Sequence, residues 1–396
     1  MPLADPSLSL CMIVRNEAEN LPRSLGPVQD RFDEIILVDT GSTDNTRELA
    51  RDMGARVISI EWPDHFARAR NISIEAARGD WILWLDADNY IAPEDVDRLR
   101  VRLDHQGRKV FWCTELVVPS GEKLIQKRMF PRNKKVYFAG RVHEQLVHPR
   151  HFASIMTDVV IMHWGYRDKI AARSKGERNL RLLKQMLADH PTDMYVQYQT
   201  GKTLLNLRRF EEALLHLNEA VRGELGLVSN PGIYLHAHVL KAQVLERLGR
   251  TDDAERELTS LLIKAPEYGP GHYLLGRMSY ARGDHETAAE TFQQFLRFGA
   301  VDPVAGLNPA HMGATAAFLL GKCLEALGQP NRAGEAYRKS ARYEPDNPEP
   351  KLALARLALA NGEKTKARSL LELCLEISPR NRRAMEMLKE AGGHAT

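Results

Sequence analysis

The chain of 396 residues has few cysteines, little net charge and no long apolar run. Its four cysteines lie far apart and form no CxxC pair, which favours reduced thiols and a cytoplasmic protein. No apolar run approaches about 18 residues and no basic segment leads into one near the start. We therefore expect neither a transmembrane segment nor a secretory signal. The formal net charge of +3 gives no field that would attract nucleic acid.

Two carboxylates follow one of the apolar segments. The run from Trp81 to Leu85 is typical of a buried strand, and Asp86 and Asp88 come directly after it. Residues i and i+2 of a strand share a face, so the two carboxylates should emerge side by side. Hard cations such as Mg²⁺ and Mn²⁺ prefer such oxygen ligands. A D-x-D taken alone is more often a solvated strand end, so its context decides.

The context is an alternation of apolar and helix-like segments. Further strands are predicted at 7–14, 34–38 and 56–60, with helices at 17–25, 44–53 and 66–77. Such alternation predicts a parallel sheet with helices on its faces, and ligands bind at the carboxyl ends of its strands. Polar residues follow these ends at Arg15, Glu17 and Asp39. No G-x-G-x-x-G follows the first strand, which disfavours a dinucleotide-binding domain.

Four segments together resemble a known family. Residues 10–17, 38–44, 69–71 and 85–88 are similar to the family-2 glycosyltransferases of GT-A fold. The nearest branch is bacterial, carries tetratricopeptide repeats and includes the sublancin-type S-glycosyltransferases. The resemblance covers about the first 165 residues. It implies an α/β GT-A domain with a Rossmann-like, mostly parallel sheet, and an inverting hexosyl- or N-acetylhexosaminyl-transferase. The expected donor is a nucleotide-diphospho sugar, most simply a UDP-sugar, with Mn²⁺ or Mg²⁺.

The resemblance also implies roles for single residues. Base and ribose would be held by Asp39 with Arg15 and Glu17, and the donor phosphates by Arg70. Asp88 would be the direct metal ligand, and Asp86 would serve the metal or the ribose. His163 corresponds to a late histidine that completes the metal site. A packed core histidine and a helix-face ion pair are the simpler interpretations of His163 and Arg70.

The general base is expected in the segment 140–145. Glu144 is the candidate, and His143 beside it is the alternative or an acceptor-site residue. The pair departs from the Glu-Asp pair more usual in the family. Without the resemblance, a His-Glu pair would be read as surface charge.

The second half of the chain is a repeat array. Small residues twelve apart recur in five pairs: Gly201 and Ala213, Ala242 and Ala254, Gly276 and Ala288, Gly321 and Ala333, Ala355 and Ala367. The second members are 41, 34, 45 and 34 residues apart, and a 34-residue period is typical of tetratricopeptide repeats. Five helix pairs should stack into an all-α superhelix.

These patterns predict four parts. They are a GT-A domain at 1–166, a connecting helix at 167–190, about five repeats at 191–382, and a helix end and tail at 383–396. Only about 75 residues of the first domain follow Asp88, before the connecting helix and the repeats. We therefore expect the connecting helix or the first repeats to complete the acceptor cleft.

Cations and aromatic residues recur on one predicted face of the repeats. The candidates for a groove are Tyr195, Tyr198, Lys202, Tyr273, Arg277, Lys322 and Arg356. Such a groove suits an extended peptide with acidic groups or a free carboxylate, or an anionic glycolipid, and the expected acceptor is a peptide, a protein or a glycan. Exposed helix charge explains the same residues equally well. The repeats could also support a homo-oligomer.

Two other functions compete with glycosyl transfer. One is a non-catalytic scaffold whose first domain senses nucleotide sugar, against which the acidic pair and His143-Glu144 argue. The other is a nucleotidyltransferase, which typically has a glycine-rich phosphate loop after the first strand. The segment Arg15-Asn16-Glu17 is not such a loop.

Overall fold

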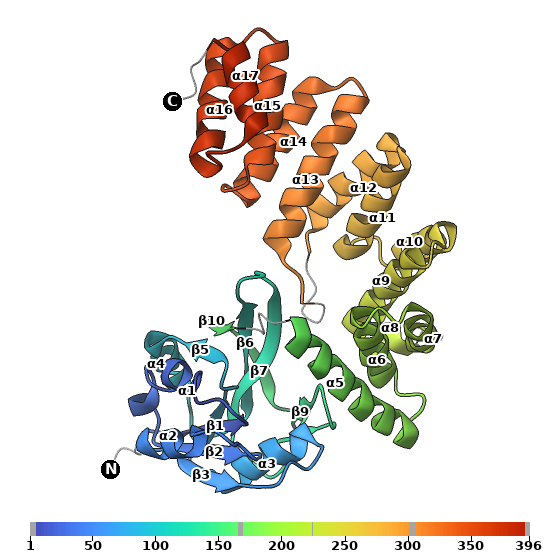
Figure 1. Cartoon of the computed structure of the whole chain (residues 1–396). Helices are drawn as coiled ribbons and strands as arrows, with labels where there is room; N and C mark the ends of the chain where they lie inside the picture. Colours follow the sequence, from blue (N-terminus) through green and yellow to red (C-terminus); the bar gives the residue numbers. More distant parts are fainter. Residues whose placement is uncertain (1–4, 165–168, 224, 301–305, 393–396) are drawn as a thin grey trace. The chain divides into compact units, whose positions relative to one another are not determined.

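The computed structural model describes residues 5–164, 169–223, 225–300 and 306–392 (Figure 1). It divides into two units, Met1–Arg222 and Gly223–Thr396. The predicted domain end at 166, the start of the predicted connecting helix and the last four residues of the tail lie outside the described residues.

An eight-stranded sheet forms the centre of the first unit, in the order β3-β2-β1-β4-β7-β6-β10-β5. The strands are β1 (Leu8–Val14), β2 (Glu34–Asp39), β3 (Arg56–Ser59), β4 (Trp81–Trp84), β5 (Asn89–Ile91), β6 (Lys109–Val117), β7 (Lys123–Pro131) and β10 (Ala153–His163). The first four strands are parallel, β7 is antiparallel to β4 and β6, and β10 is parallel to β6. A separate hairpin pairs β8 (Tyr137–Ala139) with β9 (Gln145–Val147). The carboxyl ends of β1, β2 and β4 therefore lie at one edge.

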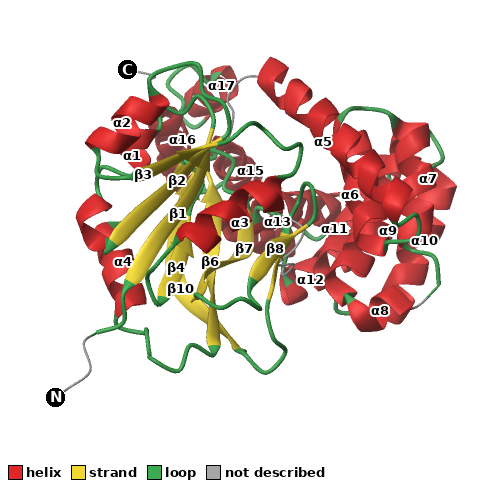
Figure 2. Ribbon diagram, turned by 90° about the horizontal axis from the view of Figure 1, so that it is seen from below, coloured by secondary structure: helices red, strands yellow, loops and turns green. Residues whose placement is uncertain are grey.

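Helices cover both faces of the sheet (Figure 2). They are α1 (Leu21–Ser24), α2 (Thr46–Asp52), α3 (Phe66–Ala76) and α4 (Pro93–Arg100), with a 3-10 turn η1 (Gln29–Arg31). Leu10 and Met12 of β1 pack in one core cluster with residues of α1, α2 and α4. Cys11 between them packs in the other cluster, with residues of α3. This alternation is the period of two that a strand imposes.

The predicted strands are confirmed to within two residues, but the predicted helix at 17–25 is wrong in extent. Only Leu21–Ser24 is helical. The N–H groups of Glu17 and Ala18 donate instead to the side chains of Thr46 (2.8 Å) and Asp44 (3.3 Å). These bonds tie the start of the segment to the loop after β2, and the single helical turn has Pro22 at its N-terminal end.

Three further helices belong to the first unit. They are α5 (Lys169–Asp189), α6 (Met194–Asn206) and α7 (Phe210–Ala220). Val142, in the segment between β8 and β9, is buried in an apolar cluster with Leu182 and Leu183 of α5 and Val196 of α6. The first predicted repeat therefore shares a core with the sheet domain.

The second unit consists of helices. They are α8 (Leu225–Ser229), α9 (Pro231–Arg247), α10 (Thr251–Lys264), α11 (Gly269–Arg282), α12 (His285–Phe298), α13 (Pro309–Ala326), α14 (Pro330–Tyr343), α15 (Pro348–Ala360), α16 (Lys364–Ile377) and α17 (Arg382–Glu390). The five predicted pairs of small residues fall on α6 with α7 in the first unit, and on α9 with α10, α11 with α12, α13 with α14 and α15 with α16 here. All ten small residues are buried. The helix-pair repeats are confirmed.

The small residue is required where two helices of a repeat touch. A Cβ on Gly321 would lie 2.4 Å from Cε1 of Tyr337, whose side chain is fully buried. A Cβ on Gly334 would meet no atom closer than 3.6 Å. We predict that Gly321→Ala lowers the free energy of unfolding by about 1–3 kcal/mol, because the ring has no space to move into.

The matched control is Gly334→Ala, which should raise stability by up to about 1 kcal/mol through helix propensity. Urea denaturation of both variants measures the difference. Equal stability of the two variants would contradict the packing proposed for the repeat.

Candidate active site

Arg70 connects the end of β4 to the segment after β8. Its Nη2 donates to Oδ1 of Asp86 at 2.8 Å, and its Nε donates to Oε1 of Glu144. The guanidinium carbon lies 4.1 Å from the centre of the Trp84 ring. Burial lowers the pKa of Arg70, but Asp86 and Glu144 together raise it above its ordinary value. Arg70 therefore stays charged and holds the two carboxylates in place.

A second buried arginine lies against the same tryptophan. Arg128 of β7 has its guanidinium carbon 3.9 Å from the Trp84 ring centre and its Nη1 3.7 Å from Oδ2 of Asp86. It also donates to Oδ1 of Asn89 at 3.0 Å and pairs with Glu115 of β6. Burial raises the pKa of Asp86, while Arg70 and Arg128 lower it, and the net shift is downward. Asp86 is thus an ionised carboxylate shared by two arginines.

Asp88 and His163 lie next to each other, and His163 also contacts Asn89. His163 Nδ1 is 3.4 Å from Oδ1 of Asp88, 3.9 Å from Oε1 of Glu115 and 3.2 Å from Nδ2 of Asn89. Burial lowers the pKa of His163, but Asp88 and Glu115 raise it, and the net shift is upward. The late histidine and the second aspartate, 75 positions apart in the sequence, are neighbours in the fold.

These residues form a continuous network, called here the β4 cluster: Arg70, Asp86, Asp88, Asn89, Glu115, Arg128, Glu144 and His163. Its four carboxylates outnumber its two guanidiniums by two charges when His163 is neutral. That excess, with Asp88 and His163 side by side, fits a divalent cation. Asp86 fits the role less well, because both of its oxygens face arginines. Within the described ranges no three His, Cys, Asp or Glu side chains are gathered as a ready-made metal site.

The predicted nucleotide residues lie at the neighbouring strand ends. Asp39 is fully buried, and its carboxylate accepts from the N–H groups of Gly41 (3.3 Å) and Ser42 (3.1 Å). Arg15 is exposed. Glu17 is half-buried, and burial together with Asp88 and Asp86 raises its pKa although Asn20 lowers it. The structure gives Asp39 a role in shaping its own loop.

Asn16 joins two of these loops. Its backbone is left-handed, with φ of 56°, and its N–H donates to the Ser42 hydroxyl at 2.9 Å. Its side-chain Oδ1 accepts from the N–H of Thr43 at 2.8 Å. Asn is one of the residues that tolerates this conformation. The polar residues after β1 and β2 thus fix the edge of the sheet beside the β4 cluster.

Of the two base candidates, only Glu144 joins the β4 cluster. The segment that carries both, residues 140–144, is called here the base loop. His143 is left-handed, with φ of 52°, and its Nε2 is buried without a hydrogen-bond partner. Burial lowers the pKa of His143 to about 4. At neutral pH it is an uncharged and very weak base.

Glu115, Arg128 and Asn89 were not among the predicted site residues. The signal was present: Glu115 and Arg128 are charged residues next to apolar ones in their strands, within FWCTELV of β6 and RMFP of β7. A buried charge in a strand needs a partner of opposite sign, but the sequence does not say which one.

Comparison with known proteins agrees with this geometry. Residues 9–165 match the family described as Glycosyl transferase family 2, and residues 239–303 and 324–391 match tetratricopeptide repeat families. The N-terminal domain belongs to glycosyltransferase family 2. The prediction of a family-2 domain fused to tetratricopeptide repeats is confirmed.

The relatives that the chain resembles include bacterial and phage proteins. A TPR repeat-containing protein of Synechococcus elongatus is 38% identical over 50% of this chain and 52% of its own. The glycosyltransferase SunS of Bacillus subtilis is 30% identical over 54% of this chain and 53% of its own, and supports the branch expected above. The chain thus spans about half the length of these curated relatives. Among solved structures, MamA aligns at a TM-score of 0.38 and 16% identity, over 47% of this chain and 92% of its own.

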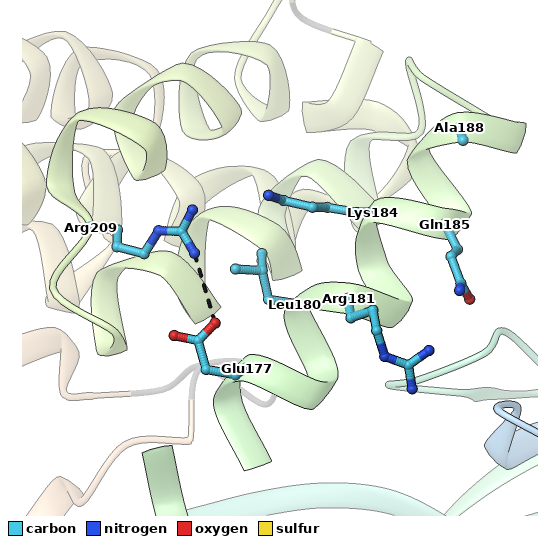
Figure 3. A pocket seen from close by; sticks show the side chains of 7 residues that line it. All are labelled: Glu177, Leu180, Arg181, Lys184, Gln185, Ala188 and Arg209. Carbon is cyan, nitrogen blue, oxygen red and sulfur yellow. Dashed lines mark ion pairs between the residues drawn. The ribbon is translucent and has the colours of Figure 1, made fainter. Parts of the chain in front are cut away.

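Two further features lie outside the β4 cluster. A hollow of about 470 Å³ is lined by Glu177, Leu180, Arg181, Lys184, Gln185 and Ala188 of α5 and by Arg209 (Figure 3). Two of its cations have anionic partners, since Arg181 pairs with Asp64 and Arg209 with Glu177. No helix in the described parts of the chain is long and apolar enough to cross a membrane.

The predicted groove residues are mostly paired with neighbours. Lys202, Arg277 and Lys322 lie 6.0, 6.0 and 5.3 Å from the rings of Tyr198, Tyr273 and Phe318, each one helical turn earlier. Arg356 Nη2 is 2.6 Å from Oε2 of Glu325. Tyr198 is fully buried and does not present the exposed ring that the prediction assumed. Tyr195 contacts the base loop.

The pair of Arg128 and Glu115 should be critical for stability. Both are nearly inaccessible, at 1% and 6% exposed. We predict that Arg128→Met lowers the free energy of unfolding by about 3–5 kcal/mol, because it leaves the buried carboxylate of Glu115 without its partner. Adding Glu115→Gln removes that charge and should recover part of the loss.

A surface pair provides the control. Arg98→Met breaks a contact with Asp95 on the exposed side of α4 and should cost less than about 1 kcal/mol. Thermal or urea unfolding measures all three variants. A loss in Arg128→Met no larger than that in Arg98→Met would contradict the buried ion pair.

Proposed function

We propose that this protein is a glycosyltransferase that moves a sugar from a nucleotide-diphospho donor, UDP-linked, to a peptide, protein or glycan acceptor. The observation that carries the proposal is the β4 cluster. It joins Asp86 of the D-x-D to Glu144 through Arg70, within a family-2 domain. The similarity to SunS, which is named a glycosyltransferase, supports the same reaction class.

Asp88 and His163 would hold the metal ion. An imidazole beside a carboxylate suits Mn²⁺ better than Mg²⁺, which takes oxygen ligands almost exclusively. Such an ion neutralises charge on the departing nucleoside diphosphate. The remaining ligands would come from phosphate oxygens and water. Arg70 and Arg128, held by Asp86, keep that carboxylate from competing for the ion.

Glu144 would accept the proton of the acceptor. As a carboxylate paired with Arg70 it has a fixed direction, since the arginine is itself held by Asp86 and stacked on Trp84. Deprotonation by Glu144 would let the acceptor oxygen or sulfur displace the nucleotide in one in-line step, with inversion at the sugar carbon. His143, uncharged at neutral pH, is not needed for this step.

Nucleotide and acceptor have separate candidate surfaces. The loops after β1 and β2, with Arg15, Glu17 and Asp39, would hold the base and ribose. The cations Lys202, Arg277, Lys322 and Arg356, with Tyr195, Tyr198 and Tyr273, were predicted to bind an anionic acceptor. Exposed Arg277 and Lys322, each over an aromatic ring, remain the best candidates for that contact. A screen of UDP-, GDP- and dTDP-sugars for nucleotide release, with and without Mn²⁺, tests the reaction directly.

The metal assignment predicts the behaviour of one variant. Asp88→Asn removes a charged ligand without changing the size of the side chain. We expect it to abolish Mn²⁺-dependent binding of UDP and transfer while the fold persists. Calorimetric titration of UDP with and without Mn²⁺ measures this, with Asp97→Asn on the exposed side of α4 as control. Wild-type affinity in Asp88→Asn would contradict the assignment.

The base assignment separates binding from turnover. Glu144→Gln should keep the donor Kd and lower kcat by roughly 10²-fold or more, because the amide cannot accept the proton. The control is Glu122→Gln, in the exposed turn between β6 and β7. Equal losses in donor binding and kcat would indicate a structural role. Unchanged transfer would leave His143 as the base candidate.

A further inference from the structure

The base loop is held by a residue of the first repeat. Tyr195, in the first turn of α6, donates its hydroxyl proton to the main-chain oxygen of His143 at 2.9 Å. The same hydroxyl accepts from Nε2 of Gln145 at 2.7 Å, and this amide also lies 3.3 Å from the His143 oxygen. Two donors that also bond each other therefore converge on the carbonyl immediately before Glu144.

That carbonyl belongs to a backbone that needs support. A non-glycine residue at φ of 52° lies in a sparsely populated region that costs about 1–3 kcal/mol and persists only when neighbours enforce it. The residue is histidine, which has no Asx-type bond of its own to offset the cost. The nearest enforcing groups are the Tyr195 hydroxyl and the Gln145 amide.

The rest of the base loop is fixed independently of Tyr195. The N–H of Phe66 donates to the oxygen of Arg141 at 2.8 Å, and Val142 is buried against α5 and α6. Asn71 bonds both the N–H and the oxygen of Phe138, at 2.8 and 2.9 Å. The peptide that joins His143 to Glu144 lies between these fixed points. Its contact with the repeats is the bond from the Tyr195 hydroxyl. Rotation of that peptide would turn Glu144 away from Arg70.

We propose that Tyr195 is a positioning residue for Glu144, so that the first repeat takes part in turnover as well as in any acceptor binding. The proposal rests on the proposed function of Glu144 as the base. Burial raises the pKa of Tyr195 to about 12, although Gln199 and Gln145 lower it, so the phenol keeps its proton and remains a donor. The sheet domain is incomplete without α6.

Tyr195→Phe tests this by removing one oxygen. We expect kcat to fall roughly tenfold, since small misplacement of a reacting group costs this much or more, while donor Kd and acceptor KM stay near wild type. Amide hydrogen exchange at residues 142–145 should become faster. Tyr234→Phe, the same change at a buried tyrosine of the second unit, is the control and should alter neither. Gln145→Ala, at an exposed position where folding is not at risk, should give the same pattern more weakly.

A double variant shows whether Tyr195 acts through Glu144. If it does, Tyr195→Phe should have almost no effect on the residual kcat of Glu144→Gln. A tenfold loss in both backgrounds, wild-type kcat in Tyr195→Phe, or unchanged exchange at 142–145 would each overturn the proposal. If Glu144→Gln itself transfers at the normal rate, the proposed function of Glu144 fails first, and the positioning role falls with it.

Discussion

The site depends on one buried guanidinium. Arg70 cannot be buried without carboxylate partners, and Asp86 and Glu144 are the two that it has. The arginine and its two partners come from three segments that are distant in the sequence: α3, the end of β4 and the base loop. The Arg70 guanidinium also stacks on the ring of Trp84. Because one rigid fork binds both carboxylates, their separation is set by the arginine and not by two independent loops.

A second arginine extends this arrangement across the sheet. Arg128 pairs with Glu115 on the adjacent strand and reaches Asp86 and Asn89, and Asn89 in turn contacts His163. The metal candidates and the base candidate therefore belong to a single network. Such a network is rigid only when every member has its partner. Loss of one arginine should therefore disturb both the metal candidates and the base candidate.

The base loop is supported from outside the sheet. Val142 is buried by side chains of α5 and α6, and Tyr195 of α6 holds the His143 carbonyl. The short segment between Asp88 and the repeats led to the expectation that the connecting helix or first repeats complete the site. In the structure α5, α6 and α7 belong to the same unit as the sheet. The sheet domain thus gains apolar cover over Val142 from the helices that follow it in the sequence.

The sequence by itself determined the alternation of strands and helices and the helix-pair repeats, because hydrophobic period and the spacing of small residues are local properties. The family-2 domain followed from the resemblance of four short segments to that family. The sequence also placed Asp86, Asp88, Glu144 and His163 among the candidates. Only the tertiary structure decided their partners: that Asp86 faces two arginines, that Asp88 adjoins His163, and that Tyr198 is buried while Tyr195 reaches the base loop. The physical reason is that charge pairing and burial act between segments far apart in the chain, and no local pattern records which segments meet.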